Sequence, residues 1–418
     1  IISRANPKVD IFIAVYKEPF NIVAKTVKAA CNIKYQHKSI FILDDGGSER
    51  LRSLAKAVNC NYLYRDSACN NKAGNLNFGL INSKAELIMT LDADRLCHPD
   101  IINKMAGYFS LPHIGFVQAA PDFDVRKGDP YGNKEEVLYK AVLPGKDNDN
   151  AAFLYGFAVM YRRRALEEIG GFSTWNIMTD MHTALRLQEK GWRSVYYNYP
   201  LSSGLAPENI QGYYRLKRQL CADSVRMLFW DSPLFKKKLS LKQKLQYFHA
   251  GFSFLVSAFV MPVFYFVPIW SLFTGDFIVS EPVSNYAFFR APLLGLTYIA
   301  GFISSYPQNI NKTSQMWSGA FPAYIYGAIF GLFSKKQTIF CALPSTGKTR
   351  IKSIALLAVL PQITIIALIL FALVYAVLNN TNTPVLLITN IFWTVLVIWL
   401  LSRICYAAFI KNKPVAVS

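Results

Sequence analysis

Two aspartates separated by one residue stand at the end of an apolar run and are suited to binding a divalent cation. The run Glu86–Asp94 reads ELIMTLDAD, so Asp92 and Asp94 follow a predicted buried strand. Side chains two positions apart on extended backbone point to the same side. Carboxylate oxygens are hard ligands of the kind that Mg²⁺ binds, so the pair could hold Mg²⁺ or Mn²⁺ together with a diphosphate. Alone the motif is weak, because Asp-x-Asp also occurs in solvated turns.

The elements that must position this pair follow a strand–helix alternation. Asp10–Tyr16, Ser39–Asp45 and Glu86–Asp94 are short apolar runs, and helical spacing of apolar residues covers Asn21–Ile33 and Glu49–Val58. Such alternation predicts an α/β fold with a doubly wound, mostly parallel sheet. Ligands of these sheets bind at the carboxyl ends of the strands, which is where the aspartates fall.

Two further groups of polar residues are expected near the same edge. Asp44 and Asp45 end the second predicted strand ahead of two glycines, although an Asp-Gly pair is first of all a turn signal. The stretch 72–77 reads KAGNLN and supplies Lys72, a glycine and two asparagines near the start of a helix. This chemistry is suited to a nucleotide.

Composition restricts the class of protein. The chain has 418 residues, of which 52% are hydrophobic and 17% charged, and 45 Lys and Arg against 26 Asp and Glu give a net charge of +19. Disordered chains, collagens and small disulfide scaffolds are excluded. The basic excess could serve nucleic acid or a membrane surface. Nucleic acid is disfavoured, because the basic residues cluster beside the long apolar runs.

The second half of the chain carries the apolar residues. Four nearly uncharged runs are long enough to span a bilayer, at about 247–273, 286–305, 354–378 and 384–409. An aromatic stretch at about 315–333 predicts a helix lying in the interface. Basic residues at 236–244 and 335–352 flank these segments and predict, by the positive-inside rule, that residues 1–235 are cytosolic. We expect a soluble domain at 1–235 and an α-helical membrane domain at 236–418.

Taken in order, these elements resemble the glycosyltransferase family 2 catalytic domain, and within it the cellulose synthase-like membrane synthases. The stretches that carry the resemblance are AVYKEP (14–19), LDDGG (43–47), YRDSACNNKAGNLN (64–77), LDAD (91–94), FVQ (116–118), YRRRALEEIGGF (161–172), MTDMHTALRLQEKGW (178–192), GLAPE (204–208) and SPLFKKKLSLKQKL (232–245). The resemblance implies a GT-A-type fold, a multi-pass protein of the plasma membrane, and an inverting hexosyltransferase.

The resemblance also implies roles for individual residues. Asp180 matches the aspartate of the family's TED motif and would be the catalytic base that deprotonates the acceptor. The donor UDP-sugar, UDP-glucose above all, would contact Tyr16, Glu18, Asp44 or Asp45, Lys72 and Asp92. Mg²⁺ or Mn²⁺ would be held by Asp92 and Asp94. A structural alternative for Asp180 is a helix N-cap.

The acceptor side departs from the family. Thr179 replaces the Glu of TED, and Tyr155, next to Gly156, replaces the usual Cys. The QxxRW motif falls on residues 216–220, where none of its defining residues is kept. Arg215, Lys217, Arg218 and Gln219 are the remaining candidates for the acceptor and diphosphate side. Residues 337–350 take the place of a gating loop, and their GKT is no P-loop because Ala342 stands where a glycine is needed.

These departures favour a changed product. We expect a processive synthase that polymerises glucose into a β-glucan and exports the growing polysaccharide through its own channel in the lipid bilayer. The linkage is expected not to be purely β-1,4, as in curdlan-type or pneumococcal type 37 capsule synthases. The alternatives are cellulose synthase proper, a hyaluronan- or chitin-like synthase, a nonprocessive transferase acting on a lipid, and a nonenzymatic scaffold.

Overall fold

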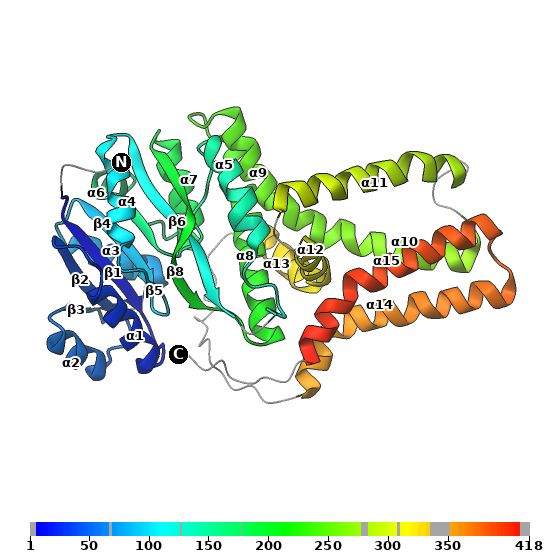
Figure 1. Ribbon diagram of the computed structural model, residues 1–418, viewed down its shortest axis with the longest axis horizontal. Helices are drawn as coiled ribbons and strands as arrows, with labels where there is room; N and C mark the ends of the chain where they lie inside the picture. The colour runs from blue at the N-terminus through cyan, green and yellow to red at the C-terminus, as the bar shows by residue number, and fades with distance from the viewer. Residues whose placement is uncertain are drawn as a thin grey trace.

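The computed structural model describes residues 6–66, 69–125, 128–176, 178–276, 283–306, 310–334 and 352–409. Figure 1 shows a sheet with its helices at one end and long helices extending away at the other, with α8 between them. The predicted gating loop at 337–350 lies outside the described residues.

One eight-stranded sheet organises the N-terminal part. Its strands run in the order β3-β2-β1-β4-β7-β6-β8-β5. They are β1 (Val9–Val15), β2 (Lys38–Asp44), β3 (Asn61–Tyr64), β4 (Leu87–Asp92), β5 (Leu96–Cys97), β6 (Ile114–Asp124), β7 (Val159–Arg162) and β8 (Arg193–Leu205). The pairs β3–β2, β2–β1, β1–β4 and β6–β8 are parallel, and β7 runs antiparallel between β4 and β6. The mostly parallel sheet expected from the sequence is confirmed.

Helices cover the sheet and position its loops. They are α1 (Phe20–Cys31), α2 (Glu49–Ala57), α3 (Asn71–Ile81), α4 (Ile101–Ala106), α5 (Leu143–Asn148), α6 (Arg163–Glu168), α7 (Thr179–Glu189) and α8 (Ile210–Trp230). The strands are buried on both faces, as shown by Ile11, Phe12 and Ile13, which are all fully buried. Burial on both faces explains why these strands read as continuous apolar runs.

Helix α8 lies between the sheet and the apolar helices. Helix α13 (Phe321–Phe333) packs closely against it. At Gly327 the backbones approach so nearly that a Cβ would lie 2.6 Å from the carbonyl oxygen of Arg218. Gln362 of helix α14 (Lys352–Asn379) is fully buried and donates hydrogen bonds of 2.6 Å to the Tyr214 hydroxyl and to the Gly319 carbonyl. Helix α8 is therefore tied directly to the apolar helices.

Three helices in the described ranges are long and apolar enough to cross a membrane. They are Leu241–Thr274, Ala355–Asn379 and Pro384–Phe409. The first consists of α9 (Leu241–Leu255), a π-helical turn (Val256–Val260) and α10 (Met261–Thr274), and the last is α15 (Pro384–Phe409). The predicted span at 286–305 falls within α11 (Val283–Ser305), whose apolar stretch is the shorter Pro292–Ile303.

The predicted interfacial helix at 315–333 is divided in two. Helix α12 (Ile310–Gly319) ends one residue before α13, with Ala320 between them. Pro322 stands in the first turn of α13. Proline has no N–H to donate and is tolerated in the first turn of a helix, whereas in the interior it interrupts the hydrogen-bonding pattern. The break between the two helices follows from this proline.

The tight approach of α13 to α8 predicts a matched pair of substitutions. Gly327→Ala should lower the stability by roughly 1–3 kcal/mol, because its Cβ would press on α8 backbone. Gly295→Ala in α11 meets nothing within 4 Å and should be neutral or stabilising by about 0.5–1 kcal/mol, as expected when alanine replaces glycine in a helix. Thermal unfolding of the detergent-solubilised variants measures both. Equal melting temperatures would contradict the packing argument.

Candidate active site

The sheet register brings the polar strand ends to one edge. Val15 of β1 pairs with Asp44 of β2, and Ala14 pairs with Asp92 of β4, so both aspartates end strands that neighbour β1. Because these strands are parallel, their carboxyl ends share one edge of the sheet. The first feature of the site is therefore a pair of acidic strand ends separated by a single strand.

Lys72 joins two of the predicted acidic residues. Its Nζ lies 2.5 Å from Oδ1 of Asp92 and 3.5 Å from Oδ2 of Asp180. Burial alone would lower the pKa of Lys72, but the Asp180 and Asp92 carboxylates outweigh it and raise this pKa above the ordinary lysine value. Residues from three distant stretches of sequence therefore form one ion cluster with lysine at its centre.

The start of α3 is held so that Lys72 can reach the cluster. Asn70 and Asn71 adopt left-handed backbone, with φ of 62° and 48°, a conformation that asparagine tolerates better than most residues. Asn75 donates a 2.7 Å hydrogen bond to the Leu43 carbonyl at the end of β2. Asn77 exchanges two hydrogen bonds with the backbone of Phe172, at 2.9 and 2.7 Å. The two asparagines of KAGNLN thus anchor the helix rather than point to a ligand.

Asp180 lies in the first turn of α7 and is buried. Its Oδ2 faces Lys72, whereas its Oδ1 is buried and makes no hydrogen bond with the described part of the chain. Burial raises the pKa of Asp180, and the neighbouring Lys72 opposes this rise. The adjacent Thr179 also has a buried hydroxyl without a partner among the described residues. A polar group is expected to fill this place, because buried polar atoms are normally hydrogen-bonded.

Gly156 closes over the ion cluster. Its φ is +80°, and a Cβ there would lie 2.3 Å from Oδ2 of Asp180 and 3.3 Å from Nζ of Lys72. Its neighbour Tyr155 donates its backbone N–H to the Gln118 side chain at 2.9 Å, and its ring packs against other aromatic rings, including Phe153 at 5.3 Å. The segment is thus fixed from the sheet side and brings bare backbone up to the carboxylate.

The Asp92–Asp94 pair offers oxygen ligands for a divalent cation. Burial raises the pKa of Asp94, the adjacent Arg95 lowers it and Asp92 raises it further. Arg95 is itself buried, with its guanidinium 4.3 Å from the centre of the Phe157 ring. No group of three potential metal-ligating side chains gathers in the described ranges. Two carboxylates completed by phosphate oxygens are a donor set that suits Mg²⁺.

Asp44 and Asp45 have different surroundings. Oδ1 of Asp44 accepts the Gly46 N–H at 2.8 Å, and its Oδ2 accepts the Ser48 N–H and the Tyr62 hydroxyl, both at 2.8 Å. The Asp44 carboxylate therefore supports the turn that follows β2. Asp45 instead forms a two-pronged ion pair with Arg65, with N–O distances of 2.5 and 2.6 Å.

Tyr16 and Glu18 lie in the neighbouring loop after β1. The Tyr16 N–H donates to the Glu18 carboxylate at 2.7 Å, and the Tyr16 side chain is 37% exposed. A Cβ on Gly46 would meet the carbonyl oxygen of Tyr16 at 1.8 Å. The turn after β2 therefore lies directly against this loop, and together they leave Tyr16 accessible at the strand edge.

The predicted acceptor-side residues of α8 have other surroundings in the part of the chain that the structure describes. Lys217 is buried and pairs with Glu135. Arg215, Arg218 and Gln219 line a cavity of about 450 Å³ together with Ala358 of α14. Arg218 also lies over the Tyr326 ring of α13. Among the predicted site residues that the structure describes, Lys72, Asp92, Gly156 and Asp180 are shown in direct proximity.

Sequence reasoning missed the residues that hold α7 in place. Asp223 and Arg226 of α8 are buried and bind the loop before α7, and His182 of α7 binds Asp231. A usable signal existed in α8, where an aspartate and an arginine three positions apart interrupt an otherwise apolar stretch.

Comparison with known proteins relates two stretches of the chain to sequence models of known families. Residues 10–170 match the sequence model for Glycosyl transferase family 2, and they contain Lys72, Asp92, Asp94 and Gly156. Residues 10–170 are therefore similar to the catalytic domain of a family 2 glycosyltransferase. Residues 167–304 match the sequence model for Cellulose synthase, so the part that contains Asp180 and α8 is cellulose synthase-like.

Curated relatives of this chain carry cellulose synthase names. It is 31% identical over 359 residues to the UDP-forming cellulose synthase 1 catalytic subunit of Komagataeibacter xylinus, which covers 82% of this chain and 46% of that protein. It is 32% identical over 266 residues to the UDP-forming cellulose synthase catalytic subunit of Xanthomonas axonopodis pv. citri. That match covers 60% of this chain and 36% of that protein. The chain thus spans less than half the length of these relatives.

A solved structure has the same fold. A mannosyltransferase from Pyrobaculum calidifontis in complex with GDP-Man and Mn²⁺ superposes with a TM-score of 0.56 at 16% identity, covering 79% of this chain and 88% of that chain. At this identity the likeness concerns the fold alone. The GT-A-type fold expected from the sequence is confirmed.

The position of Gly156 predicts a specific loss of stability. Gly128 has nearly the same φ, +81°, but a Cβ there would meet nothing within 4 Å. Gly128→Ala should therefore cost only the strain of left-handed backbone, about 1–2 kcal/mol. Gly156→Ala should cost roughly 1–3 kcal/mol more, because its Cβ displaces the Asp180 carboxylate. Thermal unfolding compares the two variants, and equal losses would exclude the close contact with Asp180.

Proposed function

We propose that this protein is a glycosyltransferase that transfers glucose from UDP-glucose to the growing end of a β-glucan, with inversion at the anomeric carbon. The observation that carries the proposal is the buried Oδ1 of Asp180, unpartnered in the described structure, on a carboxylate whose other oxygen faces Lys72. A base that receives a proton from the acceptor needs such a free oxygen within hydrogen-bond reach. The UDP-forming names of the relatives support the donor.

The chemistry assigned to these residues is a single displacement. The acceptor hydroxyl gives its proton to Asp180, and its oxygen forms a bond with the anomeric carbon as the bond to the diphosphate breaks. UDP leaves with the electron pair of that bond. Lys72, between Asp180 and Asp92, supplies positive charge on the side of the leaving group. A positive charge placed where negative charge develops stabilises the transition state.

The donor site is proposed to include a divalent cation. Asp92 and Asp94 would hold Mg²⁺ or Mn²⁺, and the cation would neutralise charge on the leaving diphosphate. On the nucleotide side we assign the contacts to Tyr16 and Glu18. Asp44 and Asp45 support the turn and the ion pair beside them, because both oxygens of each already bind groups of the protein.

The product is proposed to be a β-1,4-glucan. Departures on the acceptor side of the sequence favoured another linkage, but the relatives are named cellulose synthases and support the cellulose alternative better than a curdlan-type or capsule product. Thr179 and the replaced residues at 216–220 remain the reasons to consider a second linkage. One of these residues, Lys217, pairs with Glu135 and is therefore not available to bind a substrate.

The membrane arrangement is proposed to follow the distribution of charge. Residues 1–235 would face the cytosol, and residues 236–418 would lie in the plasma membrane and line a path for the polymer. The basic residues at 236–244, next to the first candidate span, support this orientation. Polar hydroxyl groups cannot cross hydrocarbon unpaired, so export requires a path lined by protein.

Removing the proposed base tests the function. Asp180→Asn should reduce UDP release from UDP-glucose by about 10²- to 10⁴-fold, the usual range for general-base catalysis, while UDP binding stays unchanged. Asp100→Asn, at a surface position, is the matched control. Each assay is run with Mg²⁺ and with EDTA, and activity in EDTA should be lost if Asp92 and Asp94 hold a cation. Full activity of Asp180→Asn would exclude this function.

Linkage analysis tests the product. Purified protein supplied with UDP-glucose and Mg²⁺ should yield a polymer that an endo-β-1,4-glucanase digests and whose methylation analysis gives 4-linked glucose. A β-1,3-glucanase should leave it intact. A product that is mainly 3-linked or 2-linked would instead support the alternative linkage and would leave the Asp180 mechanism unaffected.

A further inference from the structure

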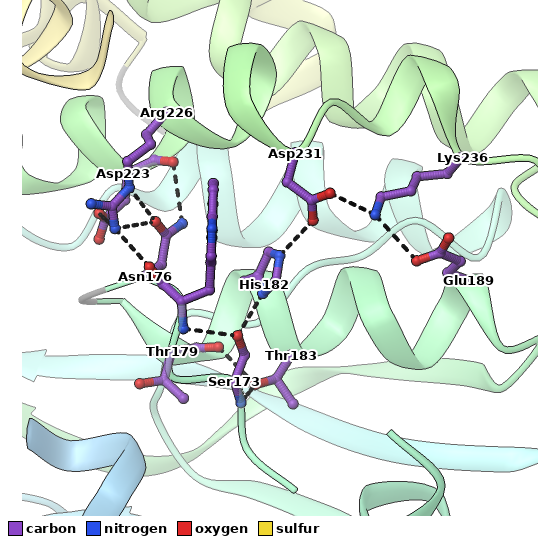
Figure 2. Close-up of polar contacts among 11 residues, drawn as sticks. Ser173, Asn176, Thr179, His182, Thr183, Glu189, Asp223, Arg226, Asp231 and Lys236 are labelled. Atoms are coloured by element: carbon purple, nitrogen blue, oxygen red, sulfur yellow. Dashed lines mark hydrogen bonds and ion pairs between the residues drawn. The ribbon is translucent and has the colours of Figure 1, made fainter. Parts of the chain in front are cut away.

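His182 lies on the face of α7 opposite to Asp180. Two positions along an α-helix correspond to a rotation of about 200°, so Asp180 faces the ion cluster while His182 faces away from it. His182 is nevertheless buried, with 4% of its surface exposed. Figure 2 shows its ring between Ser173 below and Asp231 above. The helix that carries the proposed base thus has a second buried polar residue facing the opposite way.

Both ring nitrogens of His182 are engaged. Nδ1 lies 2.5 Å from Oγ of Ser173, and Nε2 lies 2.8 Å from Oδ2 of Asp231. The Trp175 ring stacks on the imidazole at 4.8 Å between centres, and the Trp175 N–H donates to Oγ of Ser173 at 3.3 Å. A neutral imidazole with its proton on Nε2 satisfies this pattern, with the Ser173 hydroxyl donating to Nδ1.

The residue types are those of a hydrolytic triad, but the arrangement is not. In such triads the serine contacts Nε2, the carboxylate binds Nδ1 and the serine is open to substrate, whereas here Ser173 contacts Nδ1 and Asp231 contacts Nε2. Ser173 is only 2% exposed, and its oxygen already accepts the Trp175 N–H. The network therefore has no accessible nucleophile, and its chemistry is that of a fixed hydrogen-bonded connection.

This connection leads to the segment that enters the first candidate membrane span. Asp231 directly follows α8, and its Oδ1 lies 2.7 Å from Nζ of Lys236. Lys236 also lies 3.5 Å from Glu189 at the end of α7. The chain then continues into α9, where the candidate span Leu241–Thr274 begins. One face of α7 is thus bound to the link between α8 and the apolar helices.

Helix α8 holds the loop before α7 as well. Oδ2 of Asp223 accepts the Met178 N–H at 2.7 Å, two residues before Asp180. Arg226, 1% exposed, donates to Oδ1 of Asn176 at 2.9 and 2.7 Å and to the Trp175 carbonyl at 2.9 Å. The start of α7 is therefore attached to α8, and the middle of α7 is attached to the link between α8 and α9.

We propose that His182 is a positioning residue, which through Asp231 and Ser173 fixes Asp180 relative to α8 and the apolar helices. This inference rests on the proposed function, because it concerns the placement of the proposed base. The donor contacts of Lys72 and Asp92 come from α3 and β4 and do not pass through His182. Loss of His182 should therefore impair transfer to the acceptor and leave nucleotide binding unchanged.

The test compares variants of the full chain in detergent. His182→Ala should lower kcat by about 10- to 100-fold, the scale expected for a small misplacement of a reacting group, with KM for UDP-glucose and the Kd of UDP within about 2-fold of the original. His182→Gln places an amide N–H near the position of Nε2 and should restore part of kcat, because it can still donate to Asp231. Asp231→Asn should lower kcat in the same way. His98→Gln, at an exposed position, is the control.

The outcomes are separable. Unchanged kcat in His182→Ala overturns the proposal, and so does a parallel loss of UDP affinity or a glutamine variant no better than alanine, since both indicate a general structural role. If the original protein releases no UDP from UDP-glucose, the proposed function fails instead. Hydrogen exchange then decides the positioning role: faster exchange at 178–184 with unchanged exchange in α3 supports it, and unchanged exchange at 178–184 overturns it.

Discussion

The arrangement of the whole site depends on the placement of one lysine between two carboxylates. Lys72 draws Asp92 from the end of a central strand and Asp180 from the first turn of a helix that the chain reaches about a hundred residues later. Without Lys72 the two carboxylates would face one another with like charge, which disfavours ionisation of both. The sheet supplies one side of this interaction, and Gly156 covers it closely because it has no side chain.

Local patterns predicted the parts of the fold that local chemistry determines. The strands at 10–16, 39–45 and 86–94 and the helices at 21–33 and 49–58 form within two residues of their expected ends. Their apolar runs reflect burial on both faces of the sheet. Burial requires an apolar neighbour but not a particular one, so the run can be recognised without knowing what packs on it. The break between α12 and α13 could have been anticipated from Pro322, but the aromatic stretch around it reads as one continuous helix.

Patterns could not predict which polar residues bind the protein itself. Asn75 and Asn77 look suited to a nucleotide, yet both are used to attach α3 to neighbouring backbone. Lys217 looks free to bind phosphate, yet it is buried against Glu135. Residue type and spacing specify what a side chain can do, but its partner is set by segments distant in sequence. For the same reason, the sequence shows Asp223 and Arg226 only as two charged residues in an apolar stretch of α8 and does not reveal that they hold α7.

Gln362 gives helix α14 a fixed rotational setting. Its amide is fully buried and donates to Tyr214 of α8 and to the carbonyl of Gly319 in α12. Helix α14 is apolar on most sides, so hydrophobicity marks no single face strongly, and the buried amide marks the face that packs against α8 and α12. Both of its partners precede α14 in the chain. During synthesis they are therefore already present when α14 emerges, so the amide can find its hydrogen bonds as soon as the helix docks.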